Sequence, residues 1–228
     1  MENFENEIKK LLTNAGATIF GVADIQQIKK DFKIKKNVLN KLNRAVCIGV
    51  RLSDAIIDEI EDHPTLAYYH HYRRINNSLD DICLKLTNFI QREGFYAYPV
   101  AASLIADWHR QKACVSHKHI AVQAGLGWIG RNNLLVTEEF GCRVRFASVL
   151  TNMPLEPAEP LKRDCGHCKA CIDVCPVAAI KMEHEKFDHI KCFEKLKEFR
   201  KKGYVSQYIC GICLKACKPQ KTDDRKHP

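Results

Sequence analysis

Apolar residues recur at helical spacing at the start of the chain and, over a longer stretch, before its midpoint. The first stripe predicts a helix that stops at Gly16, and the second predicts a long helix that begins at Pro64 and stops at Gly94. The stripes consist of Phe4, Ile8, Leu11 and Leu12, and of Leu79, Ile82, Cys83, Leu86, Phe89 and Ile90. A short helix over Ala55–Ile60, with Ser53 as its N-cap, is predicted between them.

Compact apolar runs predict strands between and after these helices. The runs are Thr18–Ala23, Ala45–Val50, Phe95–Val100, Leu134–Thr137 and Arg143–Leu150. A further helix is predicted after Ser116, whereas Ala101–Cys114 shows no clear pattern. Strands that alternate with helices predict an α/β (α+β) fold.

Prolines at positions 154, 157 and 160 indicate a linker. We therefore expect an α/β domain over 1–157, a cysteine-rich domain over 158–220 and a basic tail over 221–228. The aromatic cluster Tyr68–Tyr72 could line a pocket or pack in the core.

The composition is that of a globular protein, with 46% hydrophobic and 28% charged residues in a chain of 228. No run of about 18 apolar residues occurs, so we expect no membrane-spanning helix. Twelve cysteines without a secretory signal indicate a reducing, cytoplasmic location. Four of them are scattered and are expected to be buried as small apolar side chains: Cys47, Cys83, Cys114 and Cys142.

The formal net charge is +9, and residues 181–228 hold 13 Lys and Arg against 7 Asp and Glu. This excess favours an acidic partner, such as an electron donor of the ferredoxin or flavodoxin class, or a nucleic acid. A solvated face with a basic tail over Lys218–Pro228 explains the charge equally well.

The cysteine run near residue 170 has the spacing C-x2-C-x2-C-x3-C-P, which holds cubane iron–sulfur clusters in bacterial ferredoxins. With the later cysteines it supplies the ligands of two [4Fe–4S] clusters. The eight predicted ligands are Cys165, Cys168, Cys171, Cys175, Cys192, Cys210, Cys213 and Cys217.

The fourth cysteine of such a run ligates the other cluster in two-cluster proteins. We therefore predict one ligand set made of the run's first three cysteines and Cys217. The second set is Cys175 with Cys192, Cys210 and Cys213. Pro176 and Pro219 would stop the local turns. The two halves are not symmetric, because Cys192 stands 18 residues before Cys210.

Two other uses of the cysteines are less consistent with the spacing. Zinc sites use C-x2-C pairs but rarely a third cysteine in the same run. A disulfide framework is disfavoured because Met1–Ile8 is charged rather than apolar.

A glycine-rich segment, Gly125–Gly130, matches G-x-G-x-x-G by letter. The dinucleotide fingerprint needs a strand before it and a helix after it, and an acidic residue about 20 positions on. Here a helix is predicted before and a strand after, and Val149 and Leu150 occupy the later position. The glycines would allow close approach of something large and flat, or form a turn with Trp128 as core filler.

The segments Ala124–Leu135 and Val149–Leu155, taken with the cysteine pattern, resemble epoxyqueuosine reductase and the wider group of corrinoid iron–sulfur proteins that includes the reductive dehalogenases. The resemblance implies a nitroreductase-like cobalamin-binding domain beside a ferredoxin-like double-cluster module. By match to the family's loop, the residues expected against a bound cobalamin (B12) are Gly125, Leu126, Gly127, Trp128, Gly130 and Arg131, the last in place of a usual lysine.

The chain also departs from the tRNA enzyme of that family. Gln111 occupies the position of the proton-donating aspartate, and Asp107 is near but not aligned. The family's C-terminal tRNA-binding region is not present in this sequence, so tRNA is a disfavoured partner. His117 and His119 resemble a smaller branch of the group, titrate near neutral pH when unperturbed, and are our candidate proton donors or cobalt ligands.

These observations favour a redox protein whose two clusters pass electrons to a base-off cobalamin, which reduces a small substrate or a corrinoid. Two alternatives remain: a ferredoxin-like electron-transfer protein without a corrinoid, and a truncated epoxyqueuosine reductase.

Overall fold

The structure is a computed structural model that describes residues 2–107 and 112–218. The chain divides into two compact units, each assembled from several stretches. The first comprises 1–50, 75–126 and 145–161, and the second comprises 51–74, 127–144 and 162–228. Gln111, Pro219 and the expected tail 221–228 lie outside the described residues.

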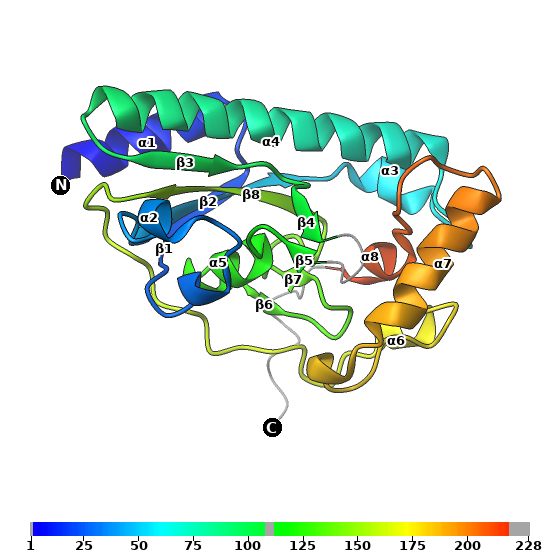
Figure 1. Ribbon diagram of the computed structural model, residues 1–228. Helices are drawn as coiled ribbons and strands as arrows, with labels where there is room; N and C mark the ends of the chain where they lie inside the picture. The colour runs from blue at the N-terminus through cyan, green and yellow to red at the C-terminus, as the bar shows by residue number, and fades with distance from the viewer. Residues whose placement is uncertain (1, 108–111, 219–228) are drawn as a thin grey trace. The chain divides into compact units, whose positions relative to one another are not determined.

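A four-stranded sheet forms the centre of the first unit, in the order β1-β2-β8-β3 (Figure 1). Its strands are β1 (Ile19–Asp24), β2 (Arg44–Arg51), β8 (Val144–Thr151) and β3 (Ala97–Val100). The β1–β2 and β3–β8 pairs are antiparallel. All four strands lie where apolar runs predict them, and the mixed helix and sheet architecture is confirmed.

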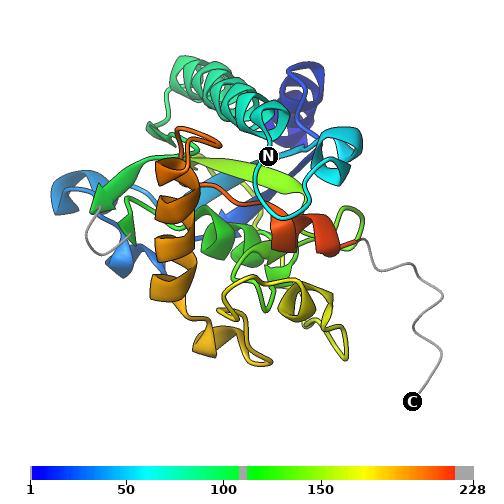
Figure 2. The same ribbon diagram turned by 90° about the vertical axis from the view of Figure 1, so that its right-hand side faces the viewer.

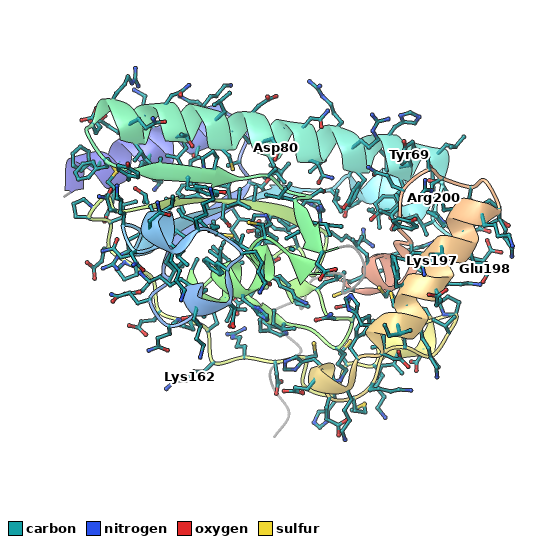
Figure 3. All side chains as sticks on the ribbon, viewed as in Figure 1. Tyr69, Asp80, Lys162, Lys197, Glu198 and Arg200 are labelled. Carbon is teal, nitrogen blue, oxygen red and sulfur yellow. The ribbon has the colours of Figure 1, made fainter. Side chains whose placement is uncertain are left out.

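Helices α1 (Glu2–Asn14) and α4 (Leu66–Arg92) lie along one face of this sheet (Figure 1). Strand side chains alternate between faces, so Val46 and Ile48 of β2 join the buried apolar stripe of α4 in one core. Asp80 of α4, labelled in Figure 3, accepts the backbone N–H of Ala102 at 2.8 Å. The long helix predicted from its stripe is thus confirmed.

Helix α5 (His117–Gln123) packs against β1 on the opposite face. Cys47 of β2 points to this side, where its thiol donates to the carbonyl oxygen of His117 at 3.8 Å. The smaller elements of the first unit are η1 (Lys29–Asp31), α2 (Lys36–Leu39) and the antiparallel pair β4 (Ile105–Asp107) and β5 (Lys112–Ala113).

The second unit consists of short elements around one longer helix (Figure 2). They are α3 (Asp54–Asp58), β6 (Trp128–Ile129), β7 (Leu135–Val136), α6 (Ala170–Asp173), η2 (His184–Lys186), α7 (His189–Lys201) and α8 (Ile212–Ala216). α8 packs on both α6 and α3. Tyr68, from the aromatic cluster, is buried, and a Cβ added to Gly211 would lie 2.9 Å from its ring, which favours core packing.

Several predicted details are corrected. Ser53 and Ser116 occupy N-cap positions, but neither hydroxyl accepts a capping hydrogen bond. The helix α7 was not predicted from its pattern. Its N-cap is Asp188, whose carboxylate accepts the N–H of Lys191 at 2.9 Å.

Within the described chain, no helix is both long enough and apolar enough to cross a bilayer.

Candidate iron–sulfur site and glycine loop

All eight predicted cluster ligands lie in the second unit. Cys171 is within α6 and Cys175 follows it, while Cys192 is within α7. Cys213 is within α8, and Cys217 is its C-cap. Because α6 packs on α8, the two cysteine motifs meet although more than 30 residues separate Cys175 from Cys210.

The first predicted ligand set is brought together. Burial raises the pKa of the Cys171 thiol to about 11, and the neighbouring thiols of Cys217, Cys165 and Cys168 raise it further. Cys171 therefore interacts with all three other members of its set. Cys168 is exposed, whereas Cys171 is buried, so the set reaches from the interior to the surface.

The second predicted set is also brought together. Burial raises the pKa of Cys192 to about 11, with further contributions from Cys210 and Cys175. Burial also raises the pKa of Cys213, with further contributions from Cys210 and Cys192, from Cys171 of the first set, and from Cys175.

Buried thiols that lie close together stay protonated, because their thiolates would repel one another, until a cation offsets that negative charge, so these groups suit a polynuclear iron centre that displaces the protons on binding. Among the described residues, no three His, Cys, Asp or Glu side chains are arranged to hold a single metal ion.

The glycines of the predicted cofactor loop are required by contacts within the chain itself. Gly125 has φ +66°, and a Cβ there would lie 2.7 Å from the carbonyl oxygen of Glu159. A Cβ on Gly127 would overlap the carbonyl oxygen of Val136, the residue paired with Trp128 across β6 and β7. Helix α5 precedes the loop, β6 lies within it, and β7 follows it where the sequence predicts a strand.

A Cβ on Gly130 would lie 2.5 Å from Cγ2 of Val136 and 3.6 Å from Sγ of Cys165. The end of the glycine loop therefore lies beside a predicted cluster ligand. Sequence reasoning did not predict this contact, because nothing in a glycine motif shows which distant thiol it will touch.

Trp128 and Leu126 are buried, which fits the core-filler interpretation. The indole Nε1 of Trp128, however, has no hydrogen-bond partner among the described residues. Buried indole N–H groups usually have an acceptor. The side chain thus offers one unused donor within the predicted cofactor loop.

Arg131 is held by the cysteine run. Its guanidinium donates to three carbonyl oxygens: Nε to Met182 at 2.8 Å, Nη1 to Cys168 at 2.7 Å and Nη2 to Gly166 at 2.7 Å. These are short, charge-assisted bonds in a planar fork that lysine cannot reproduce. We had expected Arg131 against a corrin ring; in the structure its donors fix the backbone around Cys168.

Replacing Arg131 by Lys or Gln is expected to loosen that backbone. We expect iron release to a chelator, under anaerobic conditions, to become about tenfold faster in Arg131→Gln, and nearly as fast in Arg131→Lys because the fork is lost. Arg92→Gln on α4, in the first unit, is the matched control and should not change the rate. Iron release at the wild-type rate in both Arg131 variants would contradict a stabilising role of the Arg131 guanidinium at the backbone around Cys168.

His117 is a neutral, fixed ring. Nε2 lies 3.1 Å from the carbonyl oxygen of Ala101, which can only accept, so this nitrogen carries the hydrogen. Nδ1 then accepts from Oγ of Ser148 at 3.0 Å. Burial lowers the pKa of His117 to about 4. Our expectation that His117 titrates near neutral pH is therefore corrected: desolvation keeps the ring uncharged, and the nearby charge of Arg145 adds to this, although the bond to Ala101 acts in the opposite direction.

This low pKa predicts how stability depends on pH. Above pH 6.5 the ring is neutral in both folded and unfolded chains. Below it the unfolded chain takes up the proton first, so stability falls until about pH 4. Between pH 7 and pH 5 we expect the free energy of unfolding to lose about 1 to 2 kcal/mol through this ring, after allowance for its partial exposure.

His117→Gln should make that loss smaller, as measured by denaturant unfolding at the two pH values. Identical pH dependence in the wild type and the variant would contradict this assignment. His119, the other candidate, is exposed on α5.

Sequence reasoning missed two residues beside Cys217. The pKa of Cys217 is lowered to about 7, chiefly by a hydrogen bond from the Cys142 thiol, and the Arg143 guanidinium contributes further. Arg143 is buried and donates to Asp54 at 2.7 Å and to the carbonyl oxygen of Lys215 at 2.9 Å. Cys142 is buried, as are the three other scattered cysteines, which confirms that expectation.

The basic face of α7 is partly neutralised by its own acids. Glu198 pairs with Lys195 at 2.9 Å and with Lys202 at 2.8 Å, and Glu194 pairs with Lys197 at 2.7 Å. Figure 3 shows Lys197, Glu198 and Arg200 together on this helix. Such exposed pairs contribute little to stability, but they reduce the positive charge that the helix presents.

Comparison with known protein families finds a match for the cysteine-rich segment. Residues 164–220 match the family described as 4Fe-4S double cluster binding domain. An epoxyqueuosine reductase from Bacillus anthracis is 33% identical over 123 residues, which are 50% of this chain and 32% of that protein. A tetrachloroethene reductive dehalogenase from Desulfitobacterium hafniense is 28% identical over 217 residues, 90% of this chain and 35% of that protein.

Two solved structures share the fold. The catabolic reductive dehalogenase NpRdhA has a TM-score of 0.70 at 19% identity, over 92% of this chain and 31% of that one. Epoxyqueuosine reductase from Streptococcus thermophilus has a TM-score of 0.63 at 20% identity, over 94% and 65%. The alignments span about a third of the length of the curated relatives. The chain is thus similar to the epoxyqueuosine reductases and the reductive dehalogenases, and its residues 164–220 match the 4Fe-4S double cluster binding domain.

Proposed function

We propose that this protein is a reductase in which two [4Fe–4S] clusters deliver electrons to a bound base-off cobalamin, and that it reduces a small substrate or a corrinoid. The observation that supports the proposal is that all eight thiols lie in the second unit, where Cys171, Cys192 and Cys213 are each close to other predicted ligands. The relatives support the reductase class.

The ligand sets are proposed as predicted from the spacing. Cys165, Cys168, Cys171 and Cys217 would hold one cluster, and the remaining four cysteines the other. Each set draws on both motifs, which the packing of α6 on α8 makes possible. The protein's own part is to exclude water from buried thiols, such as that of Cys171, and to hold them at the spacing that a cluster requires.

The proposed binding of a corrinoid is supported by the glycine loop and by the similarity to known relatives. One structural relative is described as carrying out B12-dependent dehalogenation. In this chain the candidate contacts are Gly125–Gly130 and Arg131. The unused indole N–H of Trp128 is the observation that fits a missing partner. When bound, a corrinoid supplies a reducible cobalt centre, which no side chain can provide.

For the remaining roles, we propose His119 as the proton donor, because His117 is neutral and internally bonded. An acidic ferredoxin or flavodoxin is the proposed electron donor, in keeping with the net charge of +9. A related epoxyqueuosine reductase is known with a modified tRNA stem loop. For this chain tRNA remains the less favoured substrate.

A second candidate function is electron transfer without a corrinoid. The observation that favours it is that contacts within the chain account for the glycines of the loop. Those glycines therefore do not require a cofactor to explain them.

Cobalamin binding separates the two candidates. Anaerobically reconstituted protein is mixed with cobalamin, and both the change in corrin absorbance and the cobalt retained after gel filtration are measured. Our proposal predicts about one cobalt per chain, and weaker retention in Trp128→Phe, which keeps the aromatic ring but loses the N–H. Full iron content without an absorbance change or retained cobalt would establish the electron-transfer candidate instead.

A further inference from the structure

Cys142 is a buried thiol that the cluster motifs do not include. It lies in the second unit, in the turn before β8, and is 2% exposed. Nδ2 of Asn132 donates to its sulfur at 3.3 Å. Asn132 is itself 4% exposed, and its Oδ1 accepts the N–H of Leu134 at 3.2 Å. The amide is thus fixed at both ends, and its NH2 group points at the Cys142 sulfur.

The same turn closes around Cys217. The thiol and the backbone N–H of Cys142 both hydrogen-bond to the Cys217 sulfur. Gly141 has φ +58°, and a Cβ there would lie 2.5 Å from the carbonyl oxygen of Cys217. The close approach of this turn therefore depends on glycine at position 141.

A thiol has one hydrogen to donate, and two acceptors compete for that of Cys142. The carbonyl oxygen of Leu214 is 3.9 Å from its sulfur, a long and weak contact. The Cys217 sulfur becomes a thiolate when it binds iron, and a charged acceptor is the stronger one. The Asn132 amide occupies a lone pair of the Cys142 sulfur and so fixes its position, and a thiolate at Cys217 would attract the thiol hydrogen more strongly than the distant Leu214 carbonyl.

We propose that Cys142 is not a cluster ligand but a hydrogen-bond donor to the ligand Cys217, that Asn132 orients it, and that this bond raises the reduction potential of the cluster held by Cys165, Cys168, Cys171 and Cys217. The inference rests on the ligand sets proposed above. Hydrogen bonds to ligating sulfurs withdraw negative charge from a cluster and stabilise its reduced form. Cys142 is therefore a positioning and tuning residue.

The test is a potentiometric titration of the reconstituted protein, followed by EPR, in which each cluster gives its own reduction step. Cys142→Val and Cys142→Ala remove the donor with and without filling the volume, and Cys142→Ser keeps a donor. Cys83→Ala, which removes a buried thiol of the first unit, is the matched control. The step that disappears in Cys171→Ala identifies the cluster that includes Cys217.

We expect that step alone to move to a more negative potential in Cys142→Val and Cys142→Ala, with full iron content. The shift should be smaller in Cys142→Ser and absent in Cys83→Ala. If Cys142→Val and Cys142→Ala leave the potential of every reduction step unchanged, the inference is overturned. Loss of half the iron in all three Cys142 variants would also overturn it, by making Cys142 a ligand. Wild-type protein without any cluster signal would instead refute the proposed function.

Discussion

Cys171→Ala is expected to reduce the iron content of the reconstituted protein from about eight to about four atoms per chain. Cys171 is buried in α6 and interacts with the three other members of its proposed set. A cubane that loses one of four thiolates has no substitute in a buried position. Iron and acid-labile sulfide, measured together on protein purified without oxygen, give the result directly.

The matched control is Cys83→Ala, which removes an equally buried thiol of the first unit. It should retain about eight iron atoms per chain. The proposed partition of ligands would be contradicted if Cys171→Ala kept all its iron. A similar iron loss in Cys83→Ala would show that the loss follows destabilisation and not ligation.

Gly127→Ala should have the largest effect on folding, lowering the free energy of unfolding by about 3 kcal/mol or more. A Cβ at this position would overlap the carbonyl oxygen of Val136, which is backbone and cannot rotate away. Relief would require β6 and β7 to separate, although Trp128 and Val136 are paired across them. Denaturant unfolding of the variant beside the wild type measures the effect.

Gly203→Ala is the control for a glycine substitution that meets no atoms. Gly203 has φ +79°, with nothing within 4 Å of an added Cβ. Its cost should be about 1 kcal/mol, from the backbone conformation alone. If Gly127→Ala lowers the free energy of unfolding by no more than Gly203→Ala does, β6 and β7 can move apart to accept the added Cβ. Packing within the chain would then not explain why position 127 needs glycine.

Much of the first unit could be predicted from the pattern of apolar positions. Leu79, Leu86 and Ile90 recur at the period of a helix, and they are the residues that α4 buries against the sheet. The apolar runs at β1 and β2 are continuous because both faces of the sheet are covered, by α1 and α4 on one side and α5 on the other.

The second unit was harder to predict, because its elements are short and its shape depends on distant contacts. Helix α7 carries charged residues at most positions, and among its described side chains only Phe199 is buried. Its pattern alone therefore gave no amphipathic stripe. The one usable signal was Asp188 ahead of the helix, a residue type that favours N-caps.

At the candidate site, the spacing predicts which thiols would form each ligand set but not what surrounds them. The two predicted cysteine sets follow from the rule that the fourth cysteine of such a run ligates the other cluster. The positions of Arg131 and Cys142 follow from contacts with Cys168 and Cys217, which are far away in the chain. The low pKa of His117 follows from burial beneath the sheet, which no pattern of histidines reveals.

The most direct test of the account is a Mössbauer spectrum of the protein reconstituted with 57Fe, with iron, zinc and labile sulfide counted on the same sample. The account predicts about eight iron and eight sulfide per chain and the signature of two [4Fe–4S]2+ clusters. One or two zinc ions per chain, with no labile sulfide and no iron retained, would contradict it.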